Sequence, residues 1–217
     1  MFSNLTTVVK NLLIANVIFF IYSNLMPEIA YTYLPAFYPD SPHFYIWQII
    51  TYMFMHADLG HIFFNMFSLL IFGPILEQTL GSKRFLNFYL ICGLGALLLH
   101  FSVDALQVFQ ATGTLFPYKT GHVTTGLEAT YLSPILGASG SVFGILLGFA
   151  YLYPNMRLML LFPPIPIKAK YLVGGLIVIE LYLILTKSGG NIAHMAHIGG
   201  ALFAYLMMKI WGIRKGY

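Results

Sequence analysis

Residues 137–153 read GASGSVFGILLGFAYLY, an apolar run that contains no charged residue and opens on a serine among small residues. Three glycines in it recur every four residues and so share one helix face: Gly140, Gly144 and Gly148. The same spacing returns at Gly200 and Ala204, with Gly199 beside them. Small residues on two helices let their backbones approach closely inside a membrane. The two segments are therefore predicted to pack against each other.

The composition is that of a membrane protein. Hydrophobic residues make up 59% of the chain and charged residues 8%, whereas a soluble domain carries roughly 25% charged residues. The aromatic content of 17% suits belts at the two membrane interfaces. The net charge of +4 comes from scattered basic residues, which argues against a nucleic-acid partner. The length of 217 residues predicts a single domain, 1–217.

Six segments are apolar enough for spanning helices, which need about 20 residues each. They are 8–25, 60–76, 85–108, 137–153, 171–185 and 192–211. No small-residue cleavage site follows the first segment, so it is predicted to be a helix and not a removable signal. The predicted fold class is an all-α membrane protein, a bundle of six transmembrane helices.

The basic residues orient this bundle. If the N-terminus is cytoplasmic, nine basic residues fall on the cytoplasmic side: Lys10, Lys83, Arg84, Arg157, Lys168, Lys170, Lys209, Arg214 and Lys215. Only Lys119 and Lys187 fall on the other side. Lysine and arginine favour cytoplasmic loops, so both termini are predicted to be cytoplasmic.

The connecting loops differ in character. The outer loop 26–59 is long and rich in aromatic residues and proline, which predicts short helices lying at the membrane interface. The other outer loops are 109–136 and 186–191. The inner loop 154–170 contains Pro163, Pro164 and Pro166, which exclude a continuous helix.

Polar residues cluster near the outer ends of three predicted helices, and polar groups inside a bilayer tend to be functional. His61 and Asn65 are four residues apart and share a helix face. Both side chains can donate hydrogen bonds to a developing oxyanion. His56 lies off that face. The alternative is that these groups only bond to loop backbone, and the residues alone leave it open.

Ser139 stands where the fourth predicted helix begins, next to Gly137 and Gly140. A helix start offers free backbone N–H groups and a positive dipole end, so this serine could be a nucleophile whose own N–H joins an oxyanion site. Close approach of the glycine-bearing helices would bring His197 within reach as a base. Phe143, one turn later, could stack against that imidazole. The alternative is that the glycines serve only packing and the serine bonds to its own helix.

No carboxylate is expected near this pair. Glu180 is predicted in the middle of the fifth helix, Glu77 at the inner end of the second, and Asp58 in a loop. A Ser-His dyad is therefore predicted in place of a Ser-His-Asp triad.

A metal site is the competing hypothesis, because His194 and His197 also share a face. Zinc sites need three or four ligands, often with a carboxylate, and no carboxylate is expected here. No metal ion and no cofactor are therefore predicted. A metal or haem protein that uses His56, His61, His194 and His197 is the rival reading.

Several motifs now fall into a familiar order. They are 47–56, His-Ile-Phe-Phe-Asn at 61–65, a Glu-x-x-x-Gly turn at 77–81, Gly-Ala-Ser-Gly at 137–140 and Ala-His-Ile-Gly-Gly at 196–200. Together they resemble the rhomboid family of intramembrane serine proteases, from Trp47 onward. Separate motifs on separate helices make chance agreement improbable.

The resemblance implies a six-helix core that opens toward the outer face. It implies Ser139 as nucleophile and His197 as general base, with an oxyanion hole formed by His61, Asn65 and the Ser139 N–H. His56 would bond to the backbone of the first outer loop. Phe143, Gly137, Gly140 and Gly199 would support the site. The fifth helix and the loop before the sixth would form a lateral gate and cap.

Two positions depart from the family pattern. Phe143 stands where many members have tyrosine, so stacking on the imidazole is kept and the hydroxyl is lost. Gln48 stands where a Trp-Arg pair is common, which bears on the packing of the first outer loop.

The expected function is an intramembrane serine endopeptidase that cleaves transmembrane segments of single-span or multi-span membrane proteins near the outer face, through an acyl-enzyme. The expected partners are those substrates and the lipid bilayer, and the expected location is a bacterial cytoplasmic membrane. The rival of the same fold is a catalytically inactive protein that binds membrane clients.

Overall fold

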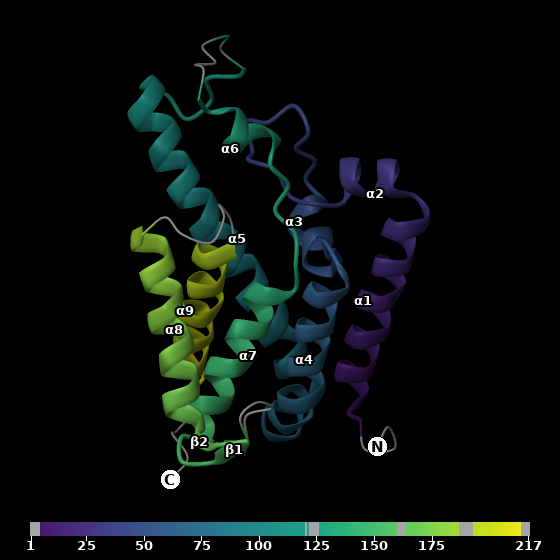
Figure 1. Cartoon of the computed structure of the whole chain (residues 1–217), viewed down its shortest axis with the longest axis vertical. Coiled ribbons are helices and arrows are strands. Elements are labelled where there is room, and N and C mark those ends of the chain that lie inside the picture. Colours follow the sequence, from purple (N-terminus) through teal and green to yellow (C-terminus); the bar gives the residue numbers. More distant parts are fainter. Residues whose placement is uncertain (1–4, 120, 122–125, 160–163, 187–192, 214–217) are drawn as a thin grey trace.

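The computed structural model describes residues 5–119, 121, 126–159, 164–186 and 193–213. Six long helices dominate it, each overlapping one predicted membrane segment (Figure 1): α1 (Thr7–Leu25), α4 (Leu59–Leu80), α5 (Ser82–Thr112), α7 (Ser139–Leu152), α8 (Ala169–Thr186) and α9 (Ala193–Ile210). Shorter elements connect them: α2 (Pro27–Tyr33), α3 (Gln48–Thr51), the 3-10 turn η2 (Tyr52–Phe54), α6 (Glu128–Leu132), and the antiparallel strands β1 (Arg157–Met159) and β2 (Pro166–Lys168). The prediction of a helical bundle is confirmed.

Four helices within the described residues are long and apolar enough to cross a membrane, namely α1, α4, α5 and α8. Helix α7 is also apolar but has only 14 residues. Such a helix is about 21 Å long, shorter than a hydrocarbon core of roughly 30 Å. Large apolar side chains point outward from the bundle, among them Leu185, which is 83% exposed. Lipid is the environment that suits such a surface, and the chain is an integral membrane protein.

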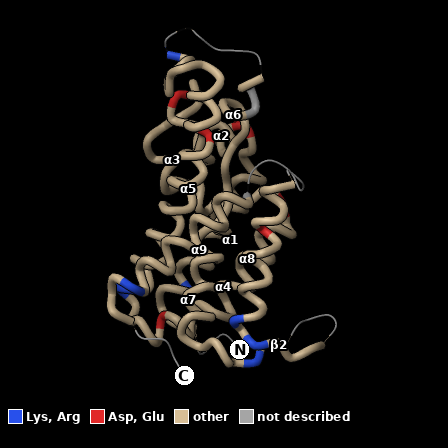
Figure 2. The backbone as a smooth tube through the Cα atoms, turned by 90° about the vertical axis from the view of Figure 1, so that its left-hand side faces the viewer, with Lys and Arg blue, Asp and Glu red and all other residues tan. Residues whose placement is uncertain are grey.

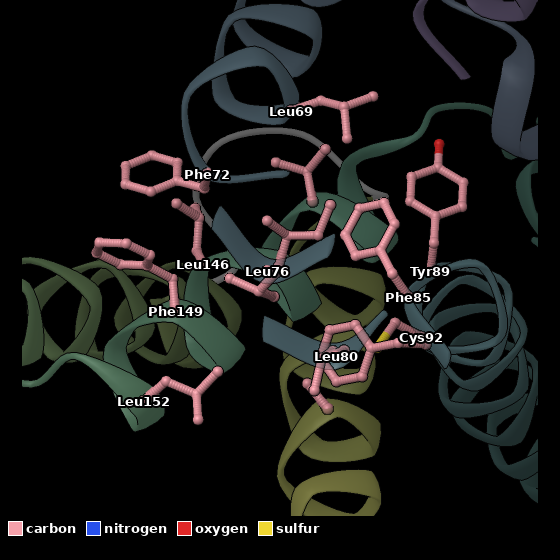
Figure 3. Packing of buried hydrophobic residues seen from close by; sticks show 14 of the residues in the cluster. Leu69, Phe72, Leu76, Leu80, Phe85, Tyr89, Cys92, Leu146, Phe149 and Leu152 are labelled. Atoms are coloured by element: carbon pink, nitrogen blue, oxygen red, sulfur yellow. The ribbon is translucent and has the colours of Figure 1, made fainter. Parts of the chain in front are cut away.

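Helix α7 has the central position. It contacts α4, α5, α8 and α9, while α1 packs against α4 on one side of the bundle and α8 covers α9 on the other (Figure 1). Below the glycine contacts, apolar side chains of α4, α5 and α7 fill the interior (Figure 3). The rings of Phe72 and Phe149 meet edge-on there, with centroids 4.9 Å apart. This packing fixes the position of α7.

The predicted contact between the two small-residue stripes is present. A Cβ on Gly200 would collide with the carbonyl oxygen of Gly140, and a Cβ on Gly144 would lie 3.2 Å from the carbonyl oxygen of Gly200. Gly199 faces α5, where a Cβ would lie 2.9 Å from the Cα of Ala96. Helices α5, α7 and α9 therefore meet backbone to backbone, as only small residues permit.

A buried carboxylate joins the end of the bundle at which α1 begins and α4 ends. The two oxygens of Glu77 accept hydrogen bonds from the backbone N–H groups of Val8 (3.1 Å) and Val9 (2.9 Å), and one of them also accepts from the Ser82 hydroxyl (2.7 Å). These N–H groups belong to the first turn of α1, which has no partner for them within its own helix. Glu77 thus connects α1, α4 and the start of α5.

We expect Glu77→Gln to destabilise the protein by about 1–3 kcal/mol, the cost of a broken buried hydrogen bond. Glutamine has the same shape, but one acceptor oxygen becomes an amide that cannot accept an N–H from α1. The melting temperature in detergent measures the effect. Glu28→Gln is the matched control, because Glu28 is exposed on α2. Equal melting temperatures for the two variants would contradict this role of Glu77.

The loop between α1 and α4 contains the short helices expected of residues 26–59, and Gln48 stabilises it. The Gln48 side chain is fully buried; its amide donates to the His43 carbonyl (2.9 Å) and its oxygen accepts from the Tyr45 N–H (3.0 Å). Ala36 and Ile135 exchange two backbone hydrogen bonds of 2.8 Å. The loop is therefore well packed with glutamine at position 48, and it is bonded to the segment that leads into α7.

The described basic residues lie mostly at one end of the bundle (Figure 2), where α1, α5 and α8 begin, α9 ends and the β-hairpin lies. They are Lys10, Lys83, Arg84, Arg157, Lys168, Lys170 and Lys209. Lys119 follows the opposite end of α5. Lys187, Arg214, Lys215 and most of the predicted cap at 186–191 lie outside the described residues. The asymmetry of basic residues thus holds in three dimensions over the part described.

Candidate active site

Ser139 is the first residue of α7, and Gly137, two residues before it, has a backbone conformation that other residues rarely adopt. Gly137 has φ 131°, and its N–H donates to the Tyr52 carbonyl (2.9 Å). A Cβ at Gly137 would lie 2.8 Å from Nε2 of His61 and 3.5 Å from Oγ of Ser139. Both the positive φ and the close approach require glycine. The His61 ring and the Ser139 hydroxyl therefore both lie beside Gly137, near each other.

The hydrogen bonds of His61 determine which ring nitrogen can donate. The Ala57 N–H points to Nδ1 of His61 (3.4 Å), so Nδ1 is an acceptor and the proton is on Nε2. Nε2 is the His61 atom that lies nearest to Gly137, on the side of Ser139. Asp58 caps α4 by accepting the backbone N–H of His61 (2.8 Å), which fixes this first turn.

Asn65 lies one turn further into α4 and is 5% exposed. Its amide nitrogen donates to the His61 carbonyl (2.9 Å), which uses one of its two hydrogens. The predicted pair thus lies on one helix face, and each side chain keeps an N–H that is free to serve another acceptor.

His56 is fully buried, and its ring meets the His61 ring edge-on at 5.0 Å. Its carbonyl oxygen accepts a hydrogen bond from the Tyr31 hydroxyl (3.2 Å), which joins it to α2. Burial lowers the pKa of His56 to about 4, so this imidazole is neutral at physiological pH.

We expect the free energy of unfolding to fall by about 3 kcal/mol as the pH drops from about 6.5 to about 4. Over this range His56 binds a proton in the unfolded chain but stays neutral in the native protein. Melting temperatures across this range measure the loss. His56→Phe keeps an aromatic ring and removes the titration, so its melting temperature should depend less on pH. Identical pH dependence in the two proteins would be evidence against a buried neutral His56.

His197 lies on α9, against the face of α7 that carries Ser139. Its ring stacks on Phe143 with centroids 4.2 Å apart and an interplanar angle of 7°. Phe143 is one turn after Ser139 on α7. A Cβ on Gly140 would lie 3.5 Å from the Ala196 carbonyl oxygen, so the two helices touch at this level. The stacking restricts the imidazole from one side.

The structure brings a carboxylate to this histidine, which the sequence reading excluded. Oε1 of Glu180 is 2.9 Å from Nδ1 of His197, and Oε2 bonds to Nδ1 of His194. The expectation of no carboxylate at matching depth is wrong. Glu180 is six residues before the end of α8, and His197 is four residues after the start of α9. Counted from the loop that joins these helices, the two residues are at nearly the same depth, and that count could have found the pair.

The argument against a metal site from a missing carboxylate also fails. Donor atoms of Glu180, His194 and His197 lie within 4.8 Å of one another, a set that could hold an ion. His56 and His61 are not part of this set, so the four-histidine centre weighed from the sequence does not form among the described residues. In the structure Glu180 bonds to Nδ1 of both histidines, while Nε2 of His194 is buried without a hydrogen-bond partner.

Known proteins of one family are similar to this chain. Residues 43–214 match the Rhomboid domain. The chain is 34% identical over 170 residues to RHOMBOID-like protein 12, mitochondrial, of Arabidopsis thaliana, covering 77% of this chain and 46% of that protein. It is 27% identical over 165 residues to Rhomboid protein 1, mitochondrial, of Saccharomyces cerevisiae (73% and 40%). It is 27% identical over 168 residues to Rhomboid protease AarA of Providencia stuartii (74% and 54%).

The chain thus spans about half the length of these relatives. Two of the three are mitochondrial by name and one is a bacterial protease. The expected location in a bacterial cytoplasmic membrane therefore gains no support from them. The relatives support membership of a membrane protein family and leave the compartment undetermined.

Proposed function

The chain belongs to the rhomboid family, and on that premise we propose that it is an intramembrane serine protease, with Ser139 as nucleophile and His197 as general base. Its substrates are membrane proteins with one or more spans. The observation that carries the proposal is that the Ser139 hydroxyl and Nε2 of His61 both lie beside Gly137, near each other. A hydroxyl next to a fixed N–H donor is what acyl transfer requires.

The reaction begins when Ser139 attacks a peptide carbonyl. With Nδ1 of His197 directed to Glu180, Nε2 is the ring atom left to take the serine proton. His61 donates its Nε2–H to the oxyanion, helped by Asn65 and by the Ser139 N–H at the start of α7. His197 then gives the proton to the leaving amine, and water hydrolyses the acyl-enzyme.

The short α7 supports cleavage within the membrane. A helix about 21 Å long that ends at the basic end cannot reach the opposite surface of a hydrocarbon core of roughly 30 Å. Ser139 would then lie below the outer surface, in a recess that water reaches from outside. In this arrangement α7 and α9 complete six crossings, and both chain ends lie on the positive side of the membrane.

A substrate helix is proposed to enter beside α8. Only 11% of the α8 span is buried inside the protein, against 22–44% for the other three candidate spans. Helix α8 is thus the least held by its neighbours. The helical substrate must unwind to expose its carbonyls, so small or helix-breaking residues near the cut should favour cleavage.

Two measurements on purified protein in detergent test the proposal. A fluorophosphonate probe should label the protein, and mass mapping should place the label on Ser139. A panel of single-span reporters should contain one that is cut at a single site inside or beside its span. A protein that resists labelling and leaves every reporter intact would be the inactive client-binding rival.

A further inference from the structure

The cluster of Glu180, His194 and His197 is not needed by a Ser-His dyad. We propose that Glu180 is a positioning residue for His197, holding Nδ1 through one carboxylate oxygen while His194 holds the other oxygen. This rests on the proposed function and extends it: the site becomes a Ser-His-Glu triad whose third member comes from α8.

The geometry gives each carboxylate oxygen one imidazole. Oε1 is 2.9 Å from Nδ1 of His197, and Oε2 bonds to Nδ1 of His194. The side chains are only 11%, 13% and 17% exposed for Glu180, His197 and His194, so water competes little for these bonds. A carboxylate accepts and cannot donate when ionised, so the proton of the bond belongs to Nδ1 of His197. In that tautomer Nε2 is unprotonated, as the accepting atom of a general base must be.

The carboxylate also acts during the reaction. When His197 takes the serine proton it becomes a cation in a site of low dielectric, where charges interact strongly. A negative charge 2.9 Å from Nδ1 stabilises that cation. Phe143 limits the ring from one face, but stacking does not distinguish the imidazole from the same ring flipped by 180°. The bond to Glu180 does.

His194 has a separate part in this arrangement. It is one turn before His197 on the same helix, and its bond to Oε2 keeps the carboxylate from turning away. Loss of His194 should therefore weaken turnover less than loss of Glu180, because the direct bond to His197 remains.

Glu180→Gln and Glu180→Leu separate charge from hydrogen bonding. Glutamine can still accept from His197 and can donate to His194, so the fold and the tautomer are kept while the charge is lost. We expect kcat to fall about tenfold for Glu180→Gln and about a hundredfold or more for Glu180→Leu, with KM within a few-fold, in the range of general acid–base contributions. His194→Gln should cost less than Glu180→Leu. The exposed Glu28→Gln is the control and should match wild type.

The imidazole tautomer gives a readout that does not depend on activity. Nitrogen NMR of ¹⁵N-histidine protein, with His197→Gln used for assignment, should show His197 protonated on Nδ1 in wild type and Glu180→Gln, and a mixture of tautomers in Glu180→Leu. An Nε2-protonated His197 in wild type, or a Glu180→Leu protein with unchanged kcat, would overturn the proposal.

Two further results distinguish a failure of the role proposed for Glu180 from a failure of the proposed protease function. Reporter cleavage that EDTA abolishes and zinc restores would show that the three donors form a metal site, against the positioning role. Wild-type protein without Ser139-dependent cleavage would refute the proposed protease function. The NMR experiment would still decide whether Glu180 determines the tautomer of His197.

Discussion

The Ser139→Ala protein is expected to fold normally and to lose cleavage by roughly 10⁵-fold or more, which is the loss seen when a nucleophile of a serine protease is removed. Ser139 is the first residue of α7, where alanine is well tolerated, and no described hydrogen bond of the fold depends on its hydroxyl. The expected melting temperature is that of wild type. Cleavage of a single-span reporter, followed by gel and by mass, measures the effect.

Ser141→Ala is the matched control two residues away. The Ser141 hydroxyl is buried and donates to the Tyr89 carbonyl (2.8 Å), so its loss should cost about 1 kcal/mol of stability while turnover stays within a few-fold. Reporter cleavage that survives in Ser139→Ala, or that disappears equally in Ser141→Ala, would show that Ser139 is not the nucleophile.

Gly200→Ala is expected to destabilise the protein by about 3 kcal/mol or more and to abolish cleavage even in molecules that still fold. The added methyl would overlap the backbone of Gly140, which is the first turn of α7 and has no flexible side chain that can move aside. Helices α7 and α9 would have to separate, and that would move Ser139 away from the helix that carries His197. Melting temperature in detergent and reporter cleavage measure both effects.

Gly175→Ala makes the same chemical change on α8. No atom lies within 4 Å of the position its Cβ would take, and alanine favours a helix over glycine by up to about 1 kcal/mol. This variant should melt at or slightly above the wild-type temperature and keep full activity. If the two alanine variants behaved alike, the close backbone contact between α7 and α9 would not be what holds the site together.

Much of this molecule follows from local sequence. Apolar segments of sufficient length, broken by prolines and basic residues, predicted the places of six helices because burial in lipid acts on each segment separately. Gly140 and Gly200 predicted a helix contact because their spacing repeats within each helix. Ser139, His61 and Asn65 could be proposed for a site from their place near helix ends alone. Their proposed catalytic roles remain predictions.

Other features depended on how the helices sit against one another. The sequence predicts Glu180 in the middle of a helix and gives no sign of its contact with His197, because that contact depends on the antiparallel pairing of α8 and α9. The tautomer of His61 depended on the direction of the Ala57 N–H. The need for glycine at position 137 depended on its φ of 131° and on the nearness of the His61 ring. Sequence determined which segments form apolar helices, since hydrophobicity is additive along the chain. Tertiary structure alone decided which polar groups meet between these helices. A hydrogen bond requires its two atoms to lie about 3 Å apart, and here those atoms belong to segments far apart in the chain.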